Sequence, residues 1–146
     1  MILQLQAGQI SAMWDAIKHA AIAANEILPA QSDKFLNNLL GNLLGGKAQA
    51  WVSFDGPPED RVIHGVAVTC IIQDPLFEIP FLLVHSIYSF NTIHVEHFHE
   101  AMSAFEQYGK TQGCSKLVAM TTNERLLKLY KHLGMERELF IYSKLL

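Results

Sequence analysis

The chain has 146 residues, half of them hydrophobic, and a formal net charge of −3. This length fits a single domain whose core is large enough to be stable without disulfides or a structural metal. The weak negative charge gives no electrostatic reason to expect nucleic acid or an anionic membrane as a partner.

Cysteine usage and the lack of a long apolar run bear on the compartment. Cys70 and Cys114 lie far apart, within or beside apolar segments, which favours buried thiols over a disulfide or a zinc pair. No run approaches the ~20 apolar residues of a membrane helix. The start, MILQLQAGQI, lacks the basic region and apolar stretch of a signal peptide. We therefore expect one cytoplasmic domain over residues 1–146.

The first part of the chain predicts a strand followed by a helix. Leucine and glutamine alternate in residues 1–7, as in a short strand. Apolar residues then recur at helical spacing over residues 9–28. Pro29 is expected to end this helix.

A second helix is predicted next. Ser32 and Asp33 are candidate N-caps. The apolar face that follows is rich in leucine, and the glycine pair at 45–46 should terminate the helix.

The centre of the chain predicts three strands. The hydrophobic period falls to two in residues 48–54 and 61–72. The segment DGPPED between them is a turn, so the two strands should form a hairpin. Residues 81–90, FLLVHSIYSF, are apolar on both faces for much of their length, which predicts a central strand that is covered on both sides.

The last part predicts a helix, a strand, a helix and a strand. One apolar helical face consists of Val95, Phe98, Met102, Phe105 and Gly109. KLVAM, residues 116–120, is predicted to be a buried strand. One of residues 121–123 should cap a helix that carries Tyr130 and ends at Gly134. The segment ELFIYSKLL, residues 138–146, is predicted to be a final strand.

The element order is therefore β-α-α-β-β-β-α-β-α-β. A strand, a helix and an adjacent strand imply a parallel pair with a right-handed crossover, whereas the hairpin is antiparallel. We expect an α/β fold with a mixed central sheet and helices on both faces.

This order resembles the GCN5-related N-acetyltransferases, whose fold is the acyl-CoA N-acyltransferase (GNAT-like) fold. The closest local match is GCSKLVAMTTNERLLKLYKHLGM, residues 113–135. In that family an asparagine follows the strand and a tyrosine precedes a similar "lGM" ending. Asn123 and Tyr130 stand at these two positions.

The resemblance implies a site for acetyl-CoA or another acyl-CoA between the strands at 81–90 and 116–121. Main-chain groups of Ser86, Ile87 and Tyr88 would hold the pantetheine arm. Tyr130 would protonate the leaving thiolate and His85 would be the general base, which is sensible chemistry for an amine attacking a thioester.

The remaining cofactor contacts implied by the resemblance lie near two helix starts. Asn123 would lie near the coenzyme, although an asparagine there is also well suited to cap a helix. Lys128, within a basic stripe of Arg125, Lys128 and Lys131, would lie near a nucleotide phosphate, although a solvated helix face explains the stripe as well. Tyr130 also completes an apolar helix face, and His85 fits a core histidine equally well.

The family's glycine-rich pyrophosphate loop should fall at about residues 92–98, which here read TIHVEHF. The length is kept, but the glycines that let the backbone approach a phosphate are missing. His94 and His97 could donate to phosphate oxygens if protonated, whereas Glu96 would repel them.

The spacing His94-x-x-His97-x-His99 also raises a metal site. On a helix, His94 and His97 lie on one side, whereas His97 and His99 lie roughly 160° apart, so one ion cannot take all three. We expect no metal site, and a two-histidine site stays the third alternative.

We predict a divergent N-acyltransferase that acts on a small-molecule or protein amine which the sequence does not identify. The alternative is a GNAT-like domain that has lost coenzyme binding and serves as an interaction or assembly module. The apolar final segment, if it lies at the sheet edge, offers a route to a homodimer.

Overall fold

The computed structural model describes residues 1–73, 76, 78–92, 94–138 and 142–146. Its elements, in chain order, are β1 (Ile2–Gln4), α1 (Ala7–Ala12), α2 (Trp14–Asn25), α3 (Pro29–Leu44), β2 (Ala48–Asp55), β3 (Val62–Gln73), β4 (Pro80–Ser89), α4 (Val95–Thr111), β5 (Leu117–Ala119) and α5 (Glu124–His132). No helix in the described ranges is both long and apolar enough to cross a membrane.

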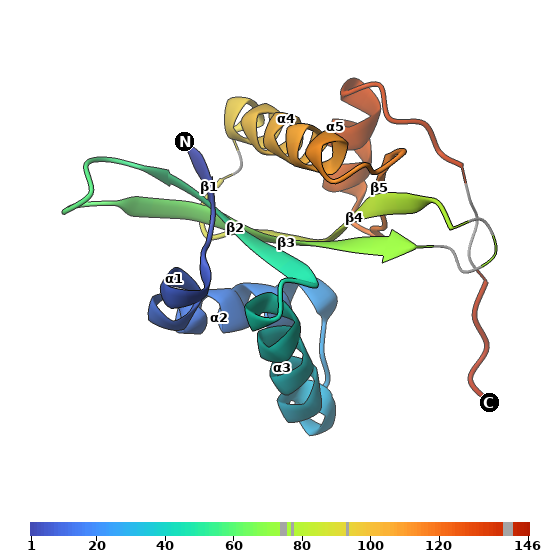
Figure 1. Ribbon diagram of the computed structural model, residues 1–146, viewed down its shortest axis with the longest axis horizontal. Helices are drawn as coiled ribbons and strands as arrows, with labels where there is room; N and C mark the ends of the chain where they lie inside the picture. Colours follow the sequence, from blue (N-terminus) through green and yellow to red (C-terminus); the bar gives the residue numbers. More distant parts are fainter. Residues whose placement is uncertain (74–75, 77, 93, 139–141) are drawn as a thin grey trace.

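The sheet has five strands in the order β1-β2-β3-β4-β5. The pairs β1–β2, β2–β3 and β3–β4 are antiparallel, and β4–β5 is parallel. These pairings confirm the predicted hairpin and the predicted parallel pair around a helical crossover. The mixed sheet with helices on both faces is also confirmed (Figure 1).

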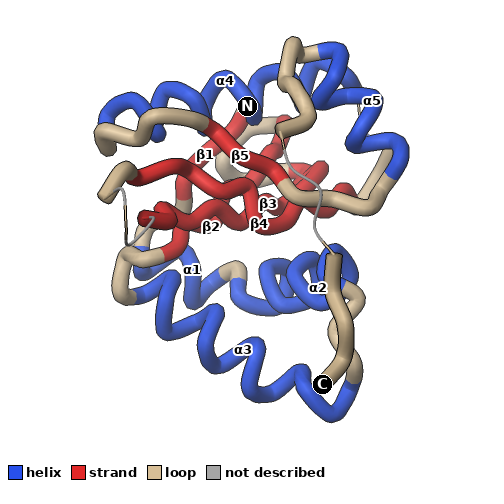
Figure 2. The backbone as a smooth tube through the Cα atoms, turned by 90° about the vertical axis from the view of Figure 1, so that its right-hand side faces the viewer, coloured by secondary structure: helices blue, strands red, loops and turns tan. Residues whose placement is uncertain are grey.

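The sheet lies between a layer of α1, α2 and α3 and a layer of α4 and α5 (Figure 2). One hydrophobic core packs against each of its faces. Alternate residues of β2 divide between them, because successive side chains of a strand point to opposite faces. Ala50 and Val52 pack beneath α1, α2 and α3, whereas Trp51 packs beneath α4 and α5. The largest fully buried side chain, Phe105 of α4, lies 5.1 Å from Trp51 between ring centroids.

The first predicted helix is two helices. Met13, with φ −106° and ψ 10°, ends α1 and precedes α2. Ile10 of α1 and Ile17 of α2 both belong to the same core despite the break. Helical spacing of apolar residues does not reveal such a break, because the spacing continues through Met13.

The second predicted helix begins earlier than expected, at Pro29 instead of after Ser32. Proline is favoured in the first turn, where its missing N–H would have no helical partner. Leu28 is the N-cap, and Ser32 donates a 2.8 Å hydrogen bond to the Pro29 carbonyl from within the helix.

The predicted final strand is wrong for the part of it that the structure describes. Glu138 and residues 142–146 form no strand, and residues 139–141 lie outside the described ranges. Tyr142 is 92% exposed, and Leu145 and Leu146 are exposed as well. An apolar pattern favours a strand only where a partner edge supplies the hydrogen bonds. The described tail residues have no such partner.

Both cysteines are free and half-buried. Burial raises the pKa of the Cys70 thiol. Both are thus less buried than the sequence pattern predicts.

Candidate functional site

β4 and β5 pair over a short distance and then part. The parallel register joins Leu82 to Leu117, Leu83 to Val118 and Val84 to Ala119. β5 ends at Ala119, whereas β4 continues to Ser89. On the side away from β3, the second half of β4 therefore has no strand partner among the described residues.

A β-bulge at His85 coincides with the point where the strands part. Thr69 of β3 pairs with Val84, and the preceding Val68 pairs with Ser86, so His85 is the extra residue. Such a bulge shifts which residues face each neighbouring strand. Its position next to a gap in the sheet is where bulges often re-aim groups near a binding site.

The hydrogen bonds on either side of the bulge show this shift. The Leu82 amide donates to the main-chain carbonyl of Lys116 on the β5 side. The Phe90 amide donates to the main-chain carbonyl of His64 in β3, and both distances are 2.9 Å. Because the main-chain groups of an antiparallel strand alternate, those of Ser86 and Tyr88 face β3. The main-chain groups of Ile87 and Ser89 face the gap.

His85 lies on the side of the sheet that carries α1, α2 and α3. Val84 and Ile87 both pack in the core beneath α4 and α5, so the two residues between them fall on the opposite face. The His85 side chain is exposed to solvent, yet partial burial lowers its pKa below 6.5. The imidazole is therefore neutral at physiological pH, as a general base must be.

Tyr130 lies in the core beneath α4 and α5 and is 8% exposed. Its ring is 5.6 Å from that of Phe98, between centroids. Val84 belongs to the same cluster, and Ala119 packs against it, so the tyrosine lies under the end of the β4–β5 pairing. Burial raises the pKa of Tyr130 to about 12.

Asn123 caps α5. Its Oδ1 accepts hydrogen bonds from the amides of Arg125 at 2.9 Å and Leu126 at 3.4 Å. The predicted capping role is thus confirmed. Lys128, on the same helix, is exposed to solvent.

The N-terminus of α4 carries the histidine segment. His94 is the N-cap in an extended conformation, with φ −80°, and no side chain caps the helix. Within the described part of this loop no residue has a positive φ, so the backbone does not use the conformations that require glycine. Because no side chain caps the helix, its first amides keep free N–H groups, and Glu96 lies beside them in the first turn.

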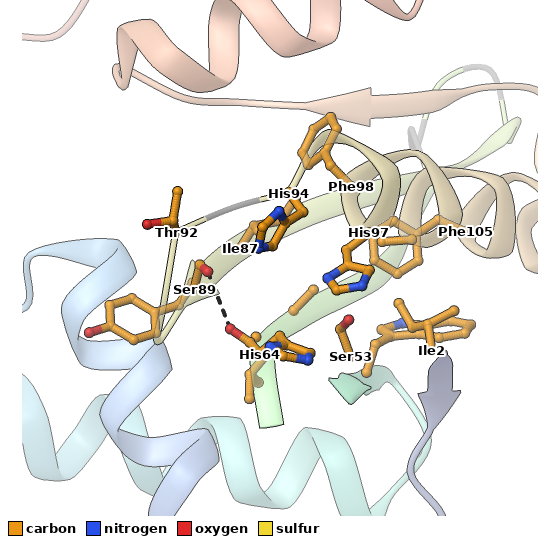
Figure 3. Close-up of a pocket in the computed structure, with 16 residues that line it drawn as sticks. Ile2, Ser53, His64, Ile87, Ser89, Thr92, His94, His97, Phe98 and Phe105 are labelled. Carbon is orange, nitrogen blue, oxygen red and sulfur yellow. Dashed lines mark hydrogen bonds between the residues drawn. The ribbon is translucent and has the colours of Figure 1, made fainter. Parts of the chain in front are cut away.

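A pocket lies beneath the first turns of α4 (Figure 3). It has a volume of about 60 Å³. The walls come from α4 and from strands β1 to β4, and they include Ile2, Ser53, His64, Ile87, His94 and His97. The hydroxyl of Ser53 is buried and has no hydrogen-bond partner within the described residues.

Three side chains from separate elements meet beside this pocket. His64 Nε2 lies 2.9 Å from Asp55 Oδ2, and His97 Nε2 lies 3.7 Å from the same oxygen. The hydrogen bond with His64 is the main reason that the pKa of Asp55 is lowered. Sequence reasoning did not identify Asp55 and gave His64 no role. No motif spacing connects the end of a hairpin to a helix that comes much later in the chain.

His97 and His99 diverge, as their spacing on one helix predicts. His97 stacks near His64, with ring centroids 4.9 Å apart, and near His94 at 5.6 Å. His99 instead contacts His132 of α5, at 5.9 Å between centroids. A set that contains all three histidines of the segment is therefore not assembled.

No protein-family model and no curated protein matches the chain. Solved structures match over its full length. One, a probable acetyltransferase, is 15% identical, covers 99% of this chain and 96% of its own, and has a TM-score of 0.74. The ribosomal-protein-alanine N-acetyltransferase from Brucella melitensis biovar Abortus 2308 is 17% identical, with coverages of 100% and 99% and a TM-score of 0.69.

A third match is the aminoglycoside N-acetyltransferase AAC(6')-Iy in complex with a CoA-based bisubstrate analogue, which is 15% identical. The alignment covers 100% of this chain and 98% of that one, with a TM-score of 0.72. The chain has the GNAT fold. The predicted fold class is confirmed. In this chain the pairing of β4 with β5 ends at Val84 and Ala119.

Proposed function

We propose that this GNAT-fold protein is an N-acyltransferase that transfers an acyl group from acyl-CoA to an amine. The observation that carries the proposal is the unpaired second half of β4. Its Ile87 and Ser89 main-chain groups face a gap that opens where β5 ends at Ala119. An extended thioester arm placed there would be bound as an added strand is bound, by main-chain hydrogen bonds.

The reaction follows from the groups around this gap. The amine nitrogen attacks the thioester carbonyl carbon, whose oxygen accepts a hydrogen bond from the Ile87 N–H. His85, or a water molecule beside it, takes the proton from the attacking nitrogen. The C–S bond then breaks, and the coenzyme leaves as a thiolate.

Tyr130 is proposed to stabilise this thiolate by donating a hydrogen bond. With a pKa of about 12, the hydroxyl stays protonated throughout the physiological range. Complete proton transfer to a thiolate, whose conjugate acid has a pKa near ~8.5, would be uphill by about 5 kcal/mol. The structure thus favours a donor that keeps its proton over the full proton transfer suggested by the family resemblance.

The coenzyme phosphates would lie near the α4 N-terminus. Its free first-turn amides and helix dipole attract an anion, and His94 is exposed beside them. Asn123 and Lys128 of α5 stay in the proposed cofactor set, together with His97, Ser86 and Tyr88. The main-chain contacts are proposed to centre on Ile87 and Ser89, because Ser86 and Tyr88 direct theirs toward β3.

Comparing three ligands in calorimetric titrations tests the proposal. Acetyl-CoA, acetyl-pantetheine and free adenosine 3′,5′-bisphosphate divide the coenzyme into its thioester and nucleotide halves. Binding of acetyl-CoA should stabilise the fold by about 2.7 kcal/mol at 100 times its Kd. Because the loop lacks glycines, most of the affinity should survive in acetyl-pantetheine.

The matched variant is Tyr130→Phe, which keeps the packing against Phe98 and removes only the hydroxyl. It should retain acetyl-CoA affinity and lower kcat by about 10–100-fold, because one hydrogen bond to a charged group contributes about 1.5–3 kcal/mol. Unchanged kcat would remove Tyr130 from the mechanism. If acetyl-CoA and acetyl-pantetheine both fail to bind at millimolar concentration, the non-catalytic interaction module is the better description.

A further inference from the structure

The side chains of Asp55, His64 and His97 form a cluster whose atoms are arranged as metal ligands. One carboxylate oxygen and two imidazole nitrogens all lie within 4.8 Å of one another. Two imidazoles with one carboxylate form a ligand set that suits zinc and non-haem iron. We propose that Asp55, His64 and His97 bind a divalent transition-metal ion of the zinc class.

The distances fit an ion between the three groups. Metal bonds of about 2.0–2.2 Å in a tetrahedral site place neighbouring ligand atoms about 3.3–3.5 Å apart. The separations from Asp55 Oδ2, 2.9 Å to His64 and 3.7 Å to His97, lie on either side of that value. The two imidazole nitrogens lie within 4.8 Å of each other, so the three side chains would draw together around a bound ion.

Backbone geometry brings two of the ligands together. Ser53 pairs with Gly65 and Phe54 pairs with Ile63, which leaves His64 as an extra residue in β3. The resulting bulge presents His64 beside Asp55, which lies on the α4 side of β2 with Trp51 and Ser53. A regular hairpin would have given each strand residue one opposing partner and no extra side chain here.

Accessibility also fits an ion-binding site. The side chains of His64 and His97 are 22% and 27% exposed, and that of Asp55 is 56% exposed. An ion can therefore enter from solvent, while two of the three ligands are held by packing. An aspartate carboxylate carries its charge at neutral pH without any special environment.

The neighbouring pocket leaves room for further ligands. His64 and His97 line it (Figure 3), and its volume of about 60 Å³ exceeds the ~10–15 Å³ that one water molecule needs. Three protein ligands with a water in the remaining position is the arrangement of a zinc ion that can also bind a substrate. The bound ion would link α4 to the β2–β3 hairpin.

The proposal does not depend on acyl transfer, so its test uses the full chain without coenzyme and with any affinity tag removed. Zn²⁺ and Co²⁺ are titrated calorimetrically into the wild-type protein and into Asp55→Asn, His64→Ala and His97→Ala. Each variant should weaken binding by about 100-fold or more, because even outer-shell partners of a metal contribute 10–100-fold. Bound Co²⁺ should give a visible absorption band that all three variants lose.

His99→Ala is the matched control, because it also removes a histidine from α4. The His99 ring contacts His132 and not the cluster. Its affinity should equal that of the wild type. His94→Ala separates this cluster from the His94–His97 pair suggested by spacing, and unchanged affinity supports the cluster. No heat at millimolar Zn²⁺, equal affinity in all variants, or a loss in His94→Ala as large as in His97→Ala would overturn the proposal.

Discussion

At the scale of single residues, environment decides what each candidate side chain can do. Tyr130 and His85 both lie near the end of the β4–β5 pairing, but Tyr130 is buried, whereas His85 is only partly covered by protein atoms and keeps an exposed surface. Burial raises the pKa of Tyr130 and lowers that of His85, because it disfavours the charged form in both cases. Both effects keep the two side chains neutral near pH 7.

A pH profile tests His85 as the base. Because its pKa lies below 6.5, kcat/KM should stay constant down to about that pH. It should then fall on the acid limb, where the imidazole gains a proton. His85→Gln should lower the rate about 100-fold, the lower end of general-base contributions, and should abolish this limb. The same acceptor amine is used with both proteins, so that its own titration is common to both profiles.

Stability gives a second readout of the same shift. The folded state resists protonating His85, so the unfolded state binds more protons as the pH falls through 6.5. Unfolding should become easier over that window, and His85→Gln should reduce this dependence. Identical rate profiles in the two proteins would remove His85 from the mechanism, whatever the stability curves show.

At the scale of elements, short helices and strands depend on their ends. α5 has only nine residues, from Glu124 to His132, which is too few for a helix that is stable by itself. Its first amides are satisfied by Asn123. Its apolar side, which includes Tyr130, packs into the core beneath α4. The cap and the packing together hold this helix beside the gap.

Asn123→Ala should destabilise the protein by about 1 kcal/mol through loss of the cap. Asn123→Asp should restore stability, because aspartate caps equally well and its charge suits the helix N-terminus. Denaturant unfolding of the three proteins measures both effects. If the aspartate variant is as unstable as the alanine variant, the side-chain amide has a role other than capping. Normal stability with weakened acetyl-CoA binding in Asn123→Asp would point to a coenzyme contact.

At the scale of the whole molecule, one sheet joins two cores. Trp14 of α2 packs against the core beneath α1, α2 and α3, whereas Trp51 belongs to the core beneath α4 and α5. β2 and β3 contribute residues to both cores. Loss of either core would therefore expose the opposite face of the same strands, which should make unfolding cooperative.

The chain's two tryptophans test this expectation. Trp14→Phe leaves a reporter on one face of the sheet, and Trp51→Phe leaves one on the other. In each variant, tryptophan fluorescence and far-ultraviolet circular dichroism should give the same denaturant midpoint. If Trp14 fluorescence changes at lower denaturant than the circular dichroism does, the layer of α1, α2 and α3 unfolds separately.

The sequence alone determined most of the local structure. Periods of two and 3.6 residues, together with turn and cap residues, predicted the hairpin, the strand β4, the long helix α4 and the cap at Asn123. These features are encoded within a few residues of one another, which is why they can be predicted. The break at Met13 and the missing pairing of residues 142–146 could not be, because apolar periodicity reports which side is buried and not which partner covers it.

The candidate sites were decided by the tertiary structure. Asp55, His64 and His97 come from two strands and a helix, and they meet because a bulge shifts the register of β3. The second half of β4 lacks a strand partner on one side because β5 stops at Ala119, and a second bulge, at His85, turns the main chain of Ile87 away from β3. A bulge is a property of the pairing between two strands. The histidine-rich segment NTIHVEHFHE therefore supplied candidate ligands. Only the packing of α4 against the sheet showed that His97 turns toward Asp55 and His64 while His99 turns toward α5.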